Sequence, residues 1–162
     1  MDEMFEKYSQ MIFRYLKGLC GDDSLAEELM QETFYQAVKS INRYDGTCKP
    51  STWLCQIAKH MWLRELKRQK RVSDIQPDES MFPLVNSAEE YVVDHYEMLS
   101  LLQKVHCLNP EAREVVLLRI NGDLSFKEIG ETIMGHSESW ARVTFYRAKK
   151  KLKEMISDEN EM

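Results

Sequence analysis

The sequence has few residues that interrupt helices, since only six glycines and four prolines occur among its 162 residues. Proline and glycine are the residues that helix interiors tolerate least, so their scarcity favours long helical segments. No apolar run approaches the roughly 18–20 residues that a membrane-spanning helix needs. The first residues, MDEMFEK, also lack the basic and then apolar plan of a signal peptide. We therefore expect a cytoplasmic protein that does not span a membrane.

Cysteine and histidine are scarce and scattered, with four of each. No two cysteines form a C-x-x-C pair, and four widely spaced thiols do not indicate a disulfide scaffold. Cys48, Cys55 and His60 match no structural zinc spacing and lack a fourth ligand. The sequence also contains no G-x-x-x-x-G-K, G-x-G-x-x-G or H-E-x-x-H motif. We expect no metal, no cofactor, no small-molecule substrate and no enzymatic activity.

Charge is distributed unevenly along a chain whose net charge is −5. Residues 59–71 contain six basic residues and one acidic residue, and residues 142–153 contain six basic residues and no acidic one. The two stretches together carry +11, so the remainder of the chain carries −16. Two basic stretches in an otherwise acidic chain indicate two separate contacts with a polyanion.

Apolar residues recur at steps of three and four along most of the chain, which predicts an all-α protein without β-strands. Two small helical domains are expected, at residues 1–71 and 87–162. Residues 72–86 contain two prolines and scattered polar residues, which predicts a flexible linker between the domains. Helices are expected over residues 5–19, 24–41, 51–71, 87–105, 109–121, 125–134 and 137–156.

Capping residues mark several of these helix starts. Capping boxes of the S-x-x-E type begin at Ser24, Ser87 and Ser125, where the serine hydroxyl accepts from the amide three residues on. Asn109 before Pro110 marks another start, because proline at the first helical position lacks only an amide that would be unpaired. Further caps are expected at Ser51 or Thr52 and at Ser137. The apolar residues expected to face inward include Val38, Ile41, Leu66, Phe145 and Ile156.

The last two helices, separated at Gly135, have the pattern of a helix-turn-helix, in which the second helix enters the major groove of duplex DNA. Arginine donates to O6 and N7 of guanine, whereas lysines further along neutralise phosphates. The residues of the final helix expected to face DNA are Ser139, Arg142, Val143, Tyr146, Arg147 and Lys150. A solvated basic face on a terminal helix is the alternative interpretation.

The second half of the chain resembles the C-terminal domain of bacterial extracytoplasmic-function sigma factors. The matching segment is LNPEAREVVLLRINGDLSFKEIGETIMGHSESWARVTFYRAKKKLKEM, with the family's L-S-[FY]-x-E-I, glycine turn and final R-A-[KR]-x-x-L. Two further segments are similar to helices of the family's N-terminal domain: LAEELMQETFYQAV and STWLCQIAKHMWLRELKRQKR. The resemblance covers nearly the whole chain outside the linker, in the same order. It implies a transcription initiation factor that binds core RNA polymerase and directs it to promoters.

The resemblance also implies roles for particular residues. The acidic helix would dock on a coiled coil of the polymerase clamp through Glu28, Gln31, Glu32 and Phe34. The third helix would hold the melted −10 element, with aromatic side chains against bases and basic ones along the backbone. Its residues would be Tyr44, Trp53, Lys59, His60, Trp62, Arg64, Lys67 and Arg68. The final helix would read the duplex −35 element. A solvated acidic face is the alternative for the docking helix, and a core position is the alternative for Trp53.

Two features depart from the family pattern. His60 stands where the family often has asparagine, and Gly130 and Gly135 are five residues apart where the family usually has four. One extra residue near Thr132 would lengthen the first helix of the motif. The family further implies an anti-sigma protein as partner, often membrane-anchored. The alternative function is a stand-alone helix-turn-helix repressor or activator, which would explain the final helix but not the basic stretch at residues 59–71.

Overall fold

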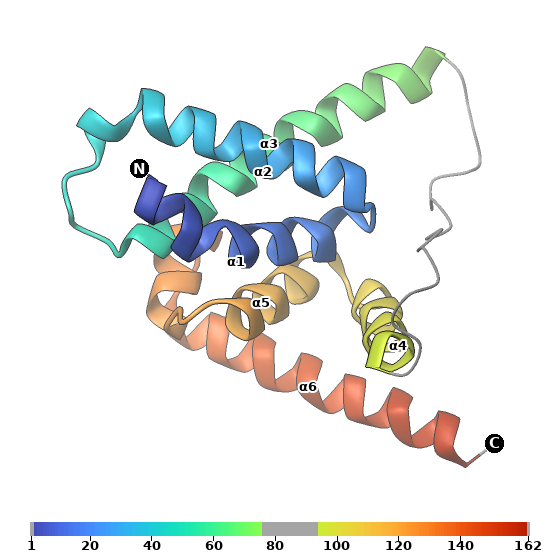
Figure 1. The fold of residues 1–162 in the computed structure, drawn as a ribbon. Coiled ribbons are helices and arrows are strands. Elements are labelled where there is room, and N and C mark those ends of the chain that lie inside the picture. Colours follow the sequence, from blue (N-terminus) through green and yellow to red (C-terminus); the bar gives the residue numbers. More distant parts are fainter. Residues whose placement is uncertain (1, 76–93, 162) are drawn as a thin grey trace. The chain divides into compact units, whose positions relative to one another are not determined.

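The computed structural model describes residues 2–75 and 94–161, and every regular element within those ranges is helical. The chain divides into two compact units, Met1–Val85 and Asn86–Met162, and Figure 1 shows the helices of each. The predicted all-α fold with two helical parts is therefore confirmed. No helix in the described ranges is long and apolar enough to cross a bilayer.

The first unit consists of three long helices and a short 3-10 turn. They are α1 (Asp2–Cys20), α2 (Asp23–Lys39), η1 (Ile41–Arg43) and α3 (Pro50–Ile75). Each long helix packs against the other two (Figure 1). Their common core contains Ile12, Tyr15, Leu16, Ala26, Ala37, Leu54 and Ala58, each at most 1% exposed. Full burial of a leucine- or isoleucine-sized side chain contributes about 1.5–3 kcal/mol, so this core fixes α2 and α3 relative to each other.

Gly21 and Asp22 form the corner between α1 and α2. Gly21 adopts the left-handed conformation (φ 73°) that commonly ends a helix, and its amide donates to the Lys17 carbonyl at 2.8 Å. The Asp22 carboxylate accepts from the amides of Ser24 and Leu25 at 2.9 and 3.2 Å. Asp22 therefore caps α2, and the prediction of a Ser24 cap is wrong. Aspartate is as good a cap as serine, and here it follows the corner glycine directly.

The boundaries of α3 also differ from the sequence prediction. The helix begins at Pro50, whose fixed φ suits the first helical position. Ser51 and Thr52 are buried within its first turn, so the expected cap at either residue is wrong. The helix continues to Ile75, beyond residue 71 and into the stretch assigned to the linker. The capping box expected at Ser87 lies outside the described residues.

Four apolar residues expected in the interior are exposed: Val38, Ile41, Leu66 and Ile156. Each lies towards the C-terminal end of its helix or just after it. Periodicity identifies which face of a helix is apolar, but it does not show where the neighbouring helix stops covering that face. The apolar stripe of these helices therefore extends past the packed core.

Over the residues that the structure describes, the second unit consists of three α-helices and one π-helical segment. They are α4 (Asp94–His106), α5 (Pro110–Asn121), η2 (Glu128–Met134) and α6 (Glu138–Asn160). The core between them contains Val115, Val116, Leu118, Leu124, Ile129 and Ala141, each at most 1% exposed. α6 packs against α5, η2 and α4, so the final helix is supported along one side by the whole unit.

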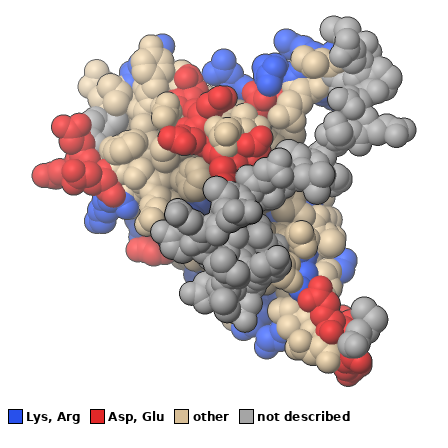
Figure 2. All heavy atoms as spheres, turned by 45° about the vertical axis from the view of Figure 1, so that its right-hand side comes forward, with Lys and Arg blue, Asp and Glu red and all other residues tan. Residues whose placement is uncertain are grey.

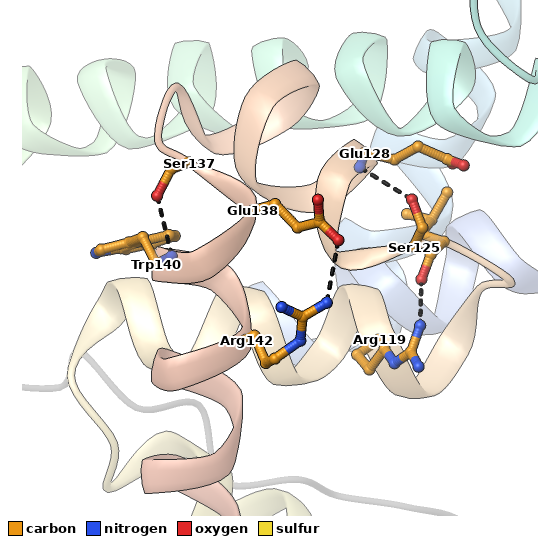
Figure 3. A network of polar contacts seen from close by, with 8 residues as sticks. Arg119, Ser125, Glu128, Ser137, Glu138, Trp140 and Arg142 are labelled. Atoms are coloured by element: carbon orange, nitrogen blue, oxygen red, sulfur yellow. Dashed lines mark hydrogen bonds and ion pairs between the residues drawn. The ribbon is translucent and has the colours of Figure 1, made fainter.

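Three predicted caps in this unit are confirmed. The Asn109 carboxamide oxygen accepts from the Ala112 amide at 2.9 Å. The Ser125 hydroxyl accepts from the Glu128 amide at 3.1 Å, and the Ser137 hydroxyl accepts from the Trp140 amide at 3.0 Å. These contacts are local, and they fix where the two helices of the helix-turn-helix begin (Figure 3).

The first helix of the helix-turn-helix is wound as a π-helix over Glu128–Met134. The carbonyl of Gly130 accepts from the amides of both Gly135 and His136. Ile129 and Ile133 remain buried. The extra residue therefore widens the turn, which corrects the expectation that it would lengthen the helix.

Gly130 and Gly135 are required for different reasons. A Cβ atom at Gly130 would lie 2.3 Å from the backbone oxygen of Ser137, so the turn packs directly against this glycine. Gly135 has open space around it but adopts a left-handed φ of 70°, which L-residues disfavour. One glycine thus permits close packing and the other permits the turn.

Acidification is expected to destabilise the second unit through His106. Burial, and secondarily the charge of Arg113, lowers the pKa of His106 below its ordinary value of 6.5. The unfolded chain then binds more protons than the folded one below about pH 6.5, so stability falls as pH decreases through 6.5 towards the folded pKa.

Denaturant unfolding at several pH values, monitored by hydrogen exchange of α4 and α5, measures this loss. His106→Gln should remove the loss, whereas His60→Gln, an exposed control, should retain it. An unchanged pH dependence in His106→Gln would contradict the assignment.

Candidate nucleic-acid and protein interfaces

The acidic residues predicted on α2 lie on its solvent-exposed side. Glu28, Gln31 and Glu32 are all exposed, and their spacing of three and four places them on one helix face. The opposite side of α2 is buried through Ala26, Leu29, Thr33 and Ala37. The buried Thr33 hydroxyl donates to the Leu29 carbonyl at 2.7 Å, so the polar group on this buried side has its hydrogen-bond partner within α2. α2 therefore presents its carboxylates outward on a fixed support.

Phe34 does not belong to this exposed face. Its side chain is only 7% exposed and packs edge-on against Phe5 of α1, with ring centroids 5.0 Å apart. The structure therefore places Phe34 in the core and not on the exposed side of α2 that carries the other three residues predicted for docking. Its burial helps to hold α2 against α1.

Two exposed apolar residues extend the acidic face. Tyr35 is 57% exposed and Val38 is 51% exposed, and they continue the helical row that begins at Glu28 and Gln31. The Lys39 ammonium lies 5.3 Å from the centroid of the Tyr35 ring. Neither residue was predicted as part of the site, and Val38 was expected to face inward, although their positions seven and ten residues after Glu28 place them near the acidic side chains. We call Glu28, Gln31, Glu32, Tyr35 and Val38 the α2 face.

The basic residues of α3 lie beyond its buried first half. His60, Arg64, Lys67 and Arg68 are exposed, and Lys59 is partly exposed. Leu54, Ala58 and Met61 on the opposite side are buried. α3 therefore presents a positively charged outer surface. In the upper part of Figure 2, Lys and Arg side chains lie beside Asp and Glu side chains.

Arg68 is engaged by a carboxylate of its own helix. Its Nη2 donates to Glu65 Oε1 at 2.6 Å and its Nε donates to Oε2 at 3.0 Å. The hydrogen bond from Arg68 lowers the pKa of Glu65. Glu65, and more weakly Glu28 of α2, raises the pKa of Arg68. Arg68 on α3 is thus attracted to Glu28 on α2 as well as to Glu65.

The aromatic residues predicted for the −10 element form one stacked pair. The rings of Tyr44 and Trp53 stack with centroids 4.8 Å apart and planes 25° apart, and both are partly exposed. The Tyr44 hydroxyl donates to the Cys48 carbonyl, which fixes its ring. One face of Trp53 is therefore covered by Tyr44 rather than open to a base. Trp62 is partly exposed further along α3.

The residues predicted to face DNA on α6 share one exposed side. All six are exposed: Ser139, Arg142, Val143, Tyr146, Arg147 and Lys150. Ala141, Ala148 and Leu152 are buried on the opposite side, and Phe145 is partly exposed. Val143 and Tyr146 are 46% and 55% exposed, so apolar surface lies between the basic side chains. This composition suits the major groove, where apolar groups contact thymine methyls and arginines reach guanine.

Arg142 is held by two side chains, and Figure 3 shows one of them, Glu138, directed at its guanidinium. Its Nη2 donates to Glu138 Oε1 at 3.0 Å, one helical turn earlier. Its guanidinium lies 5.5 Å from the centroid of the Phe126 ring. Arg119 of α5 lies 4.3 Å from the same ring and donates to the Leu124 carbonyl at 2.7 Å. None of these three neighbours, Glu138, Phe126 and Arg119, is among the site residues predicted from the sequence.

No group of three or more His, Cys, Asp or Glu side chains suited to a metal ion occurs among the described residues. Cys55 is buried in α3 and Cys48 is partly buried before it.

Known proteins share both the sequence pattern and the fold. Residues 4–72 match the sigma-70 region 2 family. The chain is 29% identical over 159 residues to the extracytoplasmic-function sigma factor SigM of Bacillus subtilis, covering 97% of this chain and 95% of that protein. It is 27% identical over 164 residues to the RNA polymerase sigma factor YlaC of the same organism, covering 99% and 94%.

A solved structure shows the same fold. It is the sigma factor RpoE from Bartonella quintana, co-crystallised with the anti-sigma factor NepR, and it matches with a TM-score of 0.77. The match covers 96% of each chain at 14% sequence identity. The whole-chain sequence matches decide against a stand-alone helix-turn-helix regulator and against an enzyme. The chain belongs to the extracytoplasmic-function sigma factors, the RNA polymerase subunits that direct promoter-specific initiation of transcription.

Proposed function

We propose that the three exposed faces divide the work of this sigma factor. The α2 face docks on the clamp of core RNA polymerase. The outer surface of α3 holds the melted −10 element, and the exposed side of α6 reads the duplex −35 element. On this assignment the first unit acts as the region 2 domain and the second as the region 4 domain. The observation that carries the proposal is the segregation of charge, with carboxylates on α2 and cations on α3 and α6.

The α2 face suits a protein partner better than nucleic acid. Carboxylates repel phosphates, so a surface led by Glu28 and Glu32 requires a partner with basic side chains. Tyr35 and Val38 add exposed apolar area beside these charges. At protein interfaces a few residues dominate the binding energy, and buried aromatic side chains are common among them. The α2 face therefore has both a steering charge and an apolar anchor.

The outer surface of α3 suits single-stranded DNA. Cationic side chains along a helix can follow a phosphate backbone, and exposed aromatic edges can stack against unpaired bases. Arg64 and Lys67 are exposed for the first role, and Trp62 and the stacked Tyr44–Trp53 pair are partly exposed for the second. His60 lies among them with an exposed imidazole, at the position where the family often has asparagine.

Removing two cations from α3 is expected to impair melting of the promoter. Lys67→Ala combined with Arg68→Ala should reduce permanganate reactivity of the −10 region at least several-fold, because every phosphate left without a cationic partner weakens the hold on the opened strand. Recovery of the variant with core polymerase should remain at the wild-type level. Lys7→Ala with Arg14→Ala removes the same charge from α1 and serves as the control. Unchanged melting with reduced polymerase affinity would show that this surface contacts protein instead.

Base reading by α6 can be tested by selection from a pool of promoters. Holoenzyme reconstituted with core polymerase is used to select from duplex promoters randomised over the −35 element, and the recovered pool is sequenced. Arg142→Ala should reduce discrimination at one base pair by about tenfold, since one good arginine–guanine pair contributes roughly 1–3 kcal/mol. Lys150→Ala should weaken all promoters alike, because phosphate contacts carry no sequence information directly.

Two results of this selection would contradict the proposal. Equal loss on every promoter for Arg142→Ala would remove its base-reading role. Absence of any enriched −35 sequence with the wild-type protein would remove the role of α6 as a whole.

We also propose a protein partner that holds this factor inactive, as the anti-sigma factor NepR is bound to RpoE in the structure of similar fold. The proposed site of action is the cytoplasm, where core polymerase and promoter DNA are found. Co-purification from cells grown without inducing stimulus, followed by displacement of the captured protein with core polymerase, tests this partner.

A further inference from the structure

We propose that Glu138 and Phe126 are positioning residues, which hold the Arg142 guanidinium in the orientation that reads the −35 element. The inference deepens the base-reading role of α6 and rests on that proposed function. Two side chains from different parts of the unit contact Arg142: Glu138 lies on α6 itself, and Phe126 lies in the segment just before η2.

Glu138 contacts Arg142 in a geometry that leaves the arginine able to bind a base. The pair is spaced by one helical turn, and Oε1 accepts from Nη2 at 3.0 Å. This contact uses one of the five N–H groups of the guanidinium. The remaining donors can reach the two acceptors of guanine. Glu138 is also the first residue of α6, where a carboxylate is favoured by the positive end of the helix dipole.

An ion pair of this kind would be a weak restraint by itself. The side chains of Arg142 and Glu138 are 50% and 44% exposed, and pairs this exposed hold a side chain only loosely. Phe126 supplies a second and independent restraint, since its ring lies 5.5 Å from the same guanidinium and is itself only 9% exposed. A charged hydrogen bond together with a buried ring restricts an arginine that would otherwise sample many rotamers.

The ring of Phe126 is in turn fixed by its surroundings. It packs against the rings of Phe145 and Tyr146, with centroids 5.6 and 6.1 Å away. The Arg119 guanidinium lies 4.3 Å from its centroid and is anchored on the Leu124 carbonyl. Figure 3 shows Glu138 and Arg142 directed toward each other on the side of α6 where Arg119 lies, whereas Trp140 points to the other side. The arrangement therefore connects the core of the unit to one base-reading side chain.

This positioning predicts an effect on selectivity without a general loss of binding. Removal of the Glu138 carboxylate takes a negative charge away from the DNA-facing helix, so affinity for all duplexes should stay equal or rise. Freed from its partner, Arg142 then samples other rotamers and reaches phosphates as well as the base. Discrimination at the base pair read by Arg142 should therefore decrease. A structural role would instead lower binding to every sequence.

The experiment uses the reconstituted holoenzyme and the pool of promoters randomised over the −35 element. Glu138→Ala should reduce discrimination about fivefold, at the same base pair that Arg142→Ala affects. The double variant should be no worse than Arg142→Ala alone, because a positioning residue has no effect once its target is absent. Glu138→Gln, which keeps an acceptor oxygen, should recover part of the discrimination. Glu154→Ala is the matched control, since it removes one exposed carboxylate from α6 away from Arg142.

Phe126→Leu gives a second arm, because leucine keeps apolar bulk but lacks the ring face. Its denaturant midpoint is first compared with that of the wild type, to establish that the fold is intact. The folded variant should then reduce discrimination at the same base pair. Loss at a different base pair in Glu138→Ala would overturn the proposal and show that the carboxylate itself accepts from a base, as carboxylates do from cytosine N4. A profile identical to that of Glu154→Ala would also overturn it. If the wild-type holoenzyme enriches a −35 sequence but Arg142→Ala leaves it unchanged, base reading by Arg142 fails and the positioning fails with it.

Discussion

Glu28→Lys combined with Glu32→Lys is expected to abolish recovery of core RNA polymerase with this factor. Both carboxylates are exposed on the α2 face, so reversing them places like charges against a basic partner. Such juxtaposition costs roughly several kcal/mol at an interface, and the loss should therefore be nearly complete rather than graded. Promoter-directed transcription in a reconstituted assay should disappear together with binding.

The fold of the double variant should remain intact. Substitutions at exposed positions usually change stability by within about 0.5 kcal/mol, and the hydrogen bond that Glu32 accepts from Gln36 is itself exposed. Glu3→Lys with Glu6→Lys makes the same charge change at exposed positions of α1 and should retain polymerase binding. Full transcription by the folded α2 variant would rule out this docking face.

Gly130→Ala is expected to destabilise the second unit strongly. The new Cβ would lie 2.3 Å from the Ser137 oxygen and 2.8 Å from the Ser137 carbonyl carbon. Both are backbone atoms at the start of α6, so no side-chain rotation relieves the clash. We expect a loss of roughly 3 kcal/mol, the upper end of the usual cost of overpacking. Denaturant unfolding, with hydrogen exchange of α6 as the local readout, measures the effect.

Gly135→Ala is the matched control for this prediction. Its Cβ would meet nothing within 4 Å, but its φ of 70° is strained for alanine. We expect a cost of about 1 kcal/mol, which reports the conformational penalty alone. If Gly130→Ala is no more destabilising than Gly135→Ala, the turn does not pack against residue 130 as closely as the structure shows.

Features that depend on a few neighbouring residues could be predicted from the sequence. The caps at Asn109 and Ser137 are confirmed because a cap requires only a side chain two or three residues before an unpaired amide. The wrong cap at Ser24 has the same origin, since Asp22 competes for the same role two residues earlier. The exposed sides of α2 and α6 follow from helical periodicity, and Glu28 and Arg142 lie where that periodicity places them.

Features that depend on tertiary packing could not be predicted. Phe34 fits the acidic helix by position, but the ring of Phe5 on another helix decides that it is buried. Phe126 reaches Arg142 across sixteen residues of chain, and no local pattern indicates that contact. The pairing of Glu138 with Arg142 could be predicted only as a possibility, because a spacing of four permits an ion pair without requiring one.

The π-helical turn at Glu128–Met134 has a consequence for the geometry of this motif. Inserting one residue into an ordinary α-helix rotates everything after it by about 100°, which would turn buried side chains toward solvent. Here the wider turn takes up the additional residue while Ile129 and Ile133 both keep their places in the core. The wider turn therefore lets this segment hold one more residue than an α-helix between the same buried positions, without turning its apolar face away from the core.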